Sequence, residues 1–72
     1  RGLLSAMSDP SLGASLLALH HDPQHPWTVA ALADTAHLSR AAFARRFVQA
    51  VGVTPMDYVT GLRMQQAQSA LA

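Results

Sequence analysis

Leucines at helical spacing mark the first predicted element of the chain. Three of them recur at positions i, i+4 and i+7, which places them on one face of an amphipathic helix: Leu12, Leu16 and Leu19. Asp9 and Pro10 precede this stripe, and an aspartate followed by a proline is typical of the N-cap and first turn of a helix. The two prolines of the next stretch, His-Asp-Pro-Gln-His-Pro, end the pattern, so the sequence predicts a helix and then a loop.

Two short helices are predicted after this loop, with only three residues between them. Thr28 can cap a helix over Val29–Ala36, and Ser39 can cap a second helix over Arg40–Ala50. Because so short a linker makes the two helices cross steeply, the spacing indicates a helix-turn-helix.

The second of these helices has one apolar face and one outward face. Phe43 and Phe47 recur at i and i+4 and are expected in the core, whereas the outward face carries arginines and small side chains: Arg40, Ala41, Ala44 and Arg45. Small residues permit close approach to a DNA duplex, and arginines can contact phosphates or pair with guanine. The periodicity alone leaves two functions open, namely DNA binding and a helical protein-interaction or self-association module.

A long helix is predicted at the end of the chain. Thr54 can cap it, Pro55 suits its first position, and its apolar pattern continues to Leu71. Within it, Met64, Ala67 and Leu71 form a stripe that lies too far along for the short helices before it to cover. Because an uncovered apolar stripe marks an interaction site, we expect this end to pair with a second copy of the chain or to fray.

Composition supports an all-α fold in one small domain. Half of the 72 residues are hydrophobic and only 12% are charged, and the abundance of alanine and leucine favours helices over strands. The net charge is only +1, but three of the five basic residues stand in one short segment: Arg40, Arg45 and Arg46. The chain has no cysteine and no apolar run long enough to span a bilayer, so we expect a cytoplasmic protein without a membrane partner.

Other candidate chemistries find little support in the sequence. His20, His21 and His25 stand close together, but the prolines around them disrupt the spacing that a helical metal site needs, so no metal ligands are predicted. His20 is interpreted as a residue at the end of its helix, where the helix dipole favours it. No catalytic triad, phosphate-binding glycine loop or carboxylate pair is present, so we predict neither an enzyme nor a cofactor.

Arg46 allows two interpretations. It follows Arg45 directly and therefore lies about 100° further round the helix, so the two side chains cannot enter the same groove. Arg46 can contact a phosphate of DNA, or it can form a surface ion pair with Asp34 or Asp57.

An ordered series of sequence matches points to a known family. The matching runs are WTVAALA at 27–33, LSRAAFARRF at 38–47, VGVTPMDY at 51–58 and LRM at 62–64, followed by Ala67. From about Asp9 onward the chain resembles the first half of the AraC/XylS-type regulator domain, and it is most similar to members that carry an N-terminal cupin-like sensor domain. His37 stands where the family commonly has glycine, but histidine tolerates a positive φ better than most residues.

The resemblance implies a homeodomain-like helix-turn-helix subdomain over residues 9–72, after a short helical segment or linker over residues 1–8. The helix over 55–71 would bridge it to a second helix-turn-helix, which this sequence does not contain. Because the chain starts at Arg1 and stops at Ala72 inside a helical pattern, we expect a fragment of a longer regulator.

The resemblance also implies double-stranded DNA as the partner and transcription regulation as the role. It places the recognition helix, Ser39–Ala50, in the major groove of the duplex. Since alanines cannot hydrogen-bond to bases, base reading would depend mainly on Arg45 and Arg40. The predicted DNA-binding residues are Ser39, Arg40, Ala41, Ala44, Arg45 and Arg46.

Overall fold

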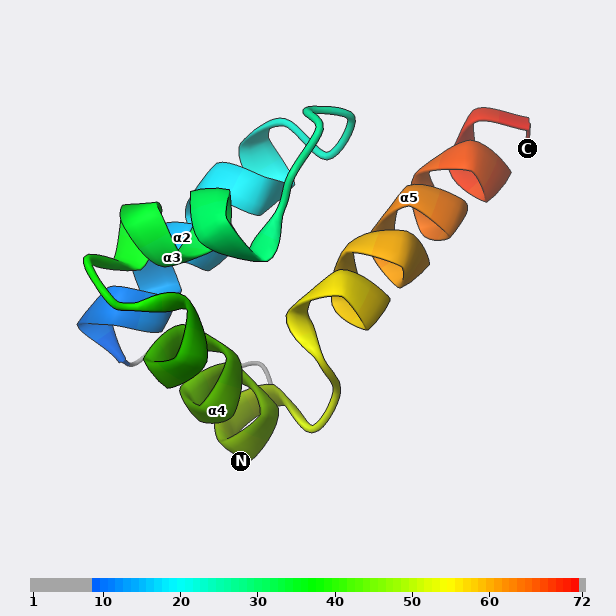
Figure 1. Cartoon of the computed structure of the whole chain (residues 1–72). Coiled ribbons are helices and arrows are strands. Elements are labelled where there is room, and N and C mark those ends of the chain that lie inside the picture. Colours follow the sequence, from blue (N-terminus) through cyan, green and yellow to red (C-terminus); the bar gives the residue numbers. More distant parts are fainter. Residues whose placement is uncertain (1–8, 72) are drawn as a thin grey trace.

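The computed structural model describes residues 9–71 of the chain, with side chains as far as residue 68. Within this range the chain forms four helices and no strand: α2 (Pro10–His21), α3 (Val29–Ala36), α4 (Arg40–Val51) and α5 (Pro55–Leu71) (Figure 1). The predicted all-α fold is confirmed. The short helical segment predicted for residues 1–8 lies outside the described residues.

The helices begin where the sequence predicts, because a side chain caps each of them. In every case a side-chain oxygen accepts a backbone N–H two or three residues further on, at 2.9 to 3.3 Å; the capping residues are Asp9, Thr28, Ser39 and Thr54. Helix α4 ends one residue later than predicted, at Val51. Gly52 closes it at a φ of 100°, which a glycine adopts without strain.

The tight turn between α3 and α4 depends on a left-handed residue. His37 adopts φ 58° and ψ 40°, as its tolerance of a positive φ predicted. This conformation lets the next N–H, that of Leu38, turn back to the Ala33 carbonyl oxygen at 3.0 Å, which satisfies the end of α3. The helix-turn-helix is therefore built by α3, His37-Leu38-Ser39 and α4.

One hydrophobic core lies between the helices. Phe43 and Phe47 are completely buried, with ring centroids 5.6 Å apart, and Leu38 packs against the same core from the turn. The predicted burial of Phe47 is confirmed. The core consists of Leu12, Leu16, Leu19, Leu32, Ala33, Ala36, Phe43, Phe47, Val59 and Leu62.

Among the described side chains of α5, those in the first part of the helix contribute to this core. Val59 and Leu62 are buried, and the ring of Tyr58 packs edge-on to Phe47 at a centroid distance of 5.7 Å. Burial raises the pKa of the Tyr58 hydroxyl, which lies 2.6 Å from Nε2 of His20. The side chain of His20, interpreted from the sequence as a helix-end residue, thus reaches across to α5.

An arginine of α5 attaches this helix to the loop between α2 and α3. The guanidinium of Arg63 donates to the carbonyl oxygen of Pro23 from Nε at 3.0 Å and to that of His25 from Nη2 at 2.7 Å. The indole N–H of Trp27 donates to the Asp22 carbonyl at 2.8 Å, a contact that joins the two ends of the same loop. No helix within residues 9–71 combines the length and apolar character needed to cross a membrane.

Candidate nucleic-acid interface

The outward side of α4 carries five of the six residues predicted to bind DNA. Ser39, Arg40, Ala41 and Arg45 are exposed, and Ala44 is partly exposed. Phe43 and Phe47 face the core from the same helix, so the exposed side of α4 is supported from behind by completely buried rings. The surface is therefore held on a rigid element, which suits a binding site.

Positive charge is concentrated on this helix. Three of the four arginines in residues 9–71 belong to α4, and α4 contains no acidic residue. Arg40 and Arg45 form no ion pair with any carboxylate of the described side chains, whereas Arg46 does. Two exposed guanidinium groups of α4 thus have their hydrogen-bond donors directed to solvent.

Arg46 lies on a different flank of α4 and binds Asp9. Its Nη2 donates to Asp9 Oδ2 at 2.6 Å, so the predicted ion pair with Asp34 or Asp57 is wrong. Helical spacing could not predict Asp9 as the partner, because the two residues are 37 positions apart in the chain. The phosphate contact that the sequence also suggested for Arg46 stays a prediction.

The Asp9 carboxylate is held in its ionised form. Loss of water contact raises its pKa, but the hydrogen bonds from the Leu12 and Ser11 amides and the charge of Arg46 outweigh this, and the net effect lowers the pKa below its ordinary value of 3.8. The contact is therefore a charged one at neutral pH.

Two further residues extend the outward face beyond those that the sequence reasoning selected. Val48 is 41% exposed and Gln49 is also exposed. They follow Arg45 by three and four positions, which puts them on the same side of the helix one turn later. That spacing was the available signal, and the sequence reasoning did not extend it beyond Arg45 and Arg46.

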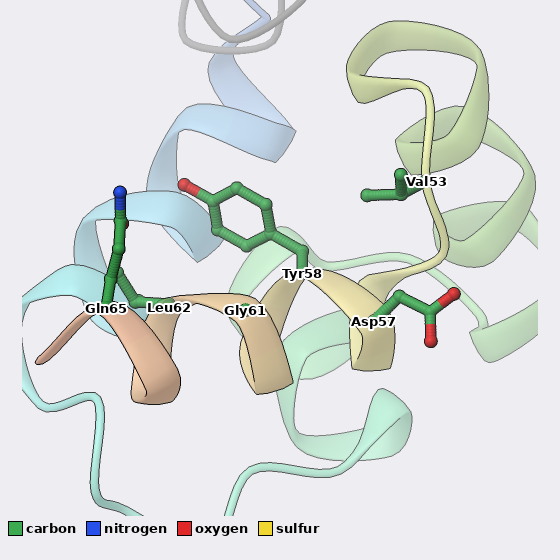
Figure 2. A pocket seen from close by; sticks show the side chains of 6 residues that line it. All are labelled: Val53, Asp57, Tyr58, Gly61, Leu62 and Gln65. Atoms are coloured by element: carbon green, nitrogen blue, oxygen red, sulfur yellow. The ribbon is translucent and has the colours of Figure 1, made fainter. Parts of the chain in front are cut away.

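A hollow in the surface lies along the first half of α5 and the connection before it. It is open, encloses about 400 Å³, and in Figure 2 Val53 projects toward the ring of Tyr58 across it. None of the predicted DNA-binding residues lines it, and the Asp57 carboxylate at its edge repels phosphate. Its lining residues are Val53, Asp57, Tyr58, Gly61, Leu62 and Gln65. Among the described side chains, no group of three histidine or acidic residues is placed to hold a metal ion.

Helices α3 and α4 are joined by a tight turn through one residue in the left-handed conformation, and α4 presents an exposed cationic face. This arrangement defines a helix-turn-helix protein. The family model "Bacterial regulatory helix-turn-helix proteins, AraC family" matches residues 19–60. The chain therefore belongs to the AraC family of bacterial regulatory helix-turn-helix proteins.

Individual relatives carry names that agree with this family. A Streptomyces lividans protein named as an AraC-like transcription regulator is 46% identical over 66 residues, which cover 92% of this chain and 22% of that protein. The RCS-specific HTH-type transcriptional activator RclR of Escherichia coli is 43% identical over 67 residues, covering 93% of this chain and 24% of RclR. The HTH-type transcriptional regulator AlkR of Acinetobacter baylyi is 41% identical over 64 residues, covering 89% of this chain and 21% of AlkR.

The chain thus spans less than a quarter of the length of these relatives, at 21% to 24%. No solved structure matches it.

Proposed function

We propose that this chain binds double-stranded DNA as a helix-turn-helix unit of a bacterial transcription regulator, with α4 lying in the major groove. The observation that supports this most directly is the outward face of α4, where Arg40 and Arg45 are exposed without a carboxylate partner among the described side chains. Membership of the AraC family and the names of the relatives agree with it.

The positions of the side chains suggest a division of roles. Arg45 stands in the middle of α4 and contacts a base edge, for which guanine is the preferred partner of arginine. Arg40 is the first residue of the helix and contacts a phosphate, next to the free amides of the helix N-terminus. Ala41 and Ala44 let the backbone approach the duplex, and the hydroxyl of Ser39 is engaged in capping α4.

This function requires neither a cofactor nor catalysis, and it locates the protein in the bacterial cytoplasm, where the chromosome lies. A single unit of this size is expected to bind weakly, with a Kd near the nonspecific range of about 10⁻⁴–10⁻⁶ M at physiological salt.

Nuclear magnetic resonance can test the proposal at such affinities. The ¹⁵N-labelled chain is titrated with short random-sequence duplexes at low salt, and the amide and arginine Nε signals are followed. We expect the signals of residues 39–49 and the Nε of Arg45 to shift, while the Nε of Arg63, engaged with the carbonyl of Pro23, stays in place. Shifts confined to α5, or no shift at all, would contradict DNA binding through α4.

A second candidate function is self-association through the outer half of α5. Met64 is 59% exposed and Ala67 is exposed, which leaves apolar surface without a covering element among the described residues. Sedimentation over a concentration series should show the mass rising with concentration, and Met64→Ser should weaken this rise. A strictly monomeric chain whose amides are protected from exchange through residue 68 would contradict both pairing and fraying of this end.

A further inference from the structure

The contact between Arg46 and Asp9 joins α4 directly to the start of α2. Arg46 Nη2 lies 2.6 Å from Asp9 Oδ2, although the residues are 37 positions apart in the chain. In Figure 1 the blue first turn of α2 lies beside the green α4, in agreement with this contact. The proposed recognition helix is thus attached to α2 by a polar contact in addition to the core.

Asp9 serves the two helices with different oxygens. Its Oδ1 accepts the amide N–H groups of Ser11 and Leu12 at 2.9 and 3.3 Å and so caps α2, while its Oδ2 accepts Arg46. The cap fixes the carboxylate in place, so it is a rigid anchor for the guanidinium rather than a mobile surface acid.

We propose that Arg46 is a positioning residue for DNA recognition, and that its ion pair with Asp9 sets the rotation of α4 about its own axis. This inference rests on the proposed function. Arg45 is the next residue round the helix, about 100° away, so any rotation of α4 turns Arg45 by the same angle. Binding groups have to be held within about 10–20° of their productive direction, so a small rotation of α4 would misdirect Arg45.

The ion pair adds to the restraint that the core provides. Phe43 and Phe47 hold α4 against its neighbours by close packing. The hydrogen bond between Arg46 and Asp9 adds a directional contact between charged groups on another flank of the helix. The side chains of Arg46 and Asp9 are 42% and 24% exposed, and ion pairs at such exposure contribute little to the free energy of unfolding. The consequence of the contact is therefore expected in DNA specificity more than in stability.

Two variants separate this role from a direct phosphate contact. Asp9→Ser keeps a good N-cap but engages its single hydroxyl there and releases Arg46, and Arg46→Met keeps the unbranched stem without the charge. Asp34→Ser is the matched control, because it removes an exposed acid that forms no ion pair with the described side chains. Affinity is measured over a range of salt concentrations for two duplexes, one selected by the wild-type chain from a randomised pool and one scrambled version of it.

If Arg46 positions α4, both variants lower the ratio of the two affinities by about threefold to tenfold, part of the discrimination that one bidentate base contact provides. The slope of log affinity against log salt then stays at the wild-type value, because no phosphate contact is lost. Circular dichroism at the assay temperature confirms that each variant is folded, and Asp9→Asn replaces Asp9→Ser if the latter melts too early. A merely structural role would lower the melting temperature and leave the affinity ratio of the folded protein unchanged.

A phosphate contact by Arg46 gives the opposite pattern. Arg46→Met would then weaken both duplexes equally and reduce the salt slope by about 0.9, while Asp9→Ser would free Arg46 and strengthen both duplexes beyond the Asp34→Ser control. That pattern, or an affinity ratio that neither variant changes, overturns the positioning role and leaves DNA binding intact. A wild-type chain that binds both duplexes equally overturns the positioning role alone, whereas a chain that binds neither duplex overturns the proposed function, and the positioning role with it.

Discussion

Helices α4 and α5 begin alike and are covered very differently. Each starts at a hydroxyl cap and places apolar residues toward the core in its first turns. In α4 the core contacts continue to the end of the helix, where Ala50 and Val51 still pack against the core. In α5 they stop early: Val59 is completely buried, whereas Met64 is 59% exposed.

The difference shows that burial is decided by neighbouring elements and not by the apolar pattern of a helix alone. The two faces of α4 differ in character: one packs against the core, and the other carries exposed arginines. Beyond Arg63, the described part of α5 has only neutral side chains, with glutamines at 65, 66 and 68. A cationic face suits DNA, and a neutral, partly apolar one suits another protein surface.

The largest effect is expected from a core truncation in α4. Phe47→Ala should reduce the free energy of unfolding by about 3–5 kcal/mol, because it removes a completely buried ring from a small core. Met64→Ala, in the uncovered part of α5, should stay within about 0.5 kcal/mol of the parent. Urea melts of both variants measure this. Equal losses would show that the two helices are covered alike.

The outward faces should differ in DNA binding by a smaller amount. In a chain extended by the second helix-turn-helix that the family resemblance implies, Arg45→Ala should weaken binding to a preferred duplex by about 1–3 kcal/mol and relax the preference at one or two base pairs. Arg40→Ala should weaken all duplexes similarly and flatten the salt dependence. Gln66→Ala, on the neutral face of α5, is the control and should change neither. Unchanged affinity and preference in the Arg45 variant would show that the base contact is wrongly assigned.

Anchoring of α5 by Arg63 should contribute less again. Arg63→Met keeps the stem but removes two hydrogen bonds to the backbone of the loop between α2 and α3, and water can partly replace them at this half-buried site. We expect a loss of about 1 kcal/mol and faster amide exchange in the first half of α5. Gln66→Met serves as the control. An Arg63 variant with the stability and exchange rates of the parent would show that the core alone holds α5.

Features that depend on neighbours in the chain could be predicted from the sequence. A cap needs a side-chain oxygen two or three residues before a backbone amide. Thr28, Ser39 and Thr54 supply such an oxygen directly before an apolar helical pattern, so they can be recognised in the sequence. The positive φ of His37 was expected from the family resemblance, because His37 stands where the family commonly has glycine. The exposed residues of α4 were predicted from periodicity, apart from its later turns.

Polar contacts between distant elements could not be predicted. The pairs Arg46–Asp9, His20–Tyr58 and Arg63–Pro23 connect residues 37, 38 and 40 positions apart. Helical periodicity specifies which side of a helix is buried, but not how far that helix slides or turns against the next one. A long arginine side chain can reach several acceptors, so periodicity alone does not specify which of them it contacts.

The smallest expected effect is a pH dependence of the stability that arises from Asp9, the residue that contacts α4 through Arg46. The folded chain holds the pKa of Asp9 below its ordinary value of 3.8, so folding favours the carboxylate. The stability that this carboxylate contributes is fully present above about pH 4 and is lost as the pH falls through the lower pKa of the folded state. Asp9→Asn keeps the cap without an ionisable group, so the difference in melting temperature between wild type and variant should shrink from pH 5 to pH 2.5. If the melting temperatures of wild type and variant instead differ by a constant amount over that range, Asp9 has the same pKa in the folded and unfolded chain. Its contacts with α2 and Arg46 then do not favour the charged form.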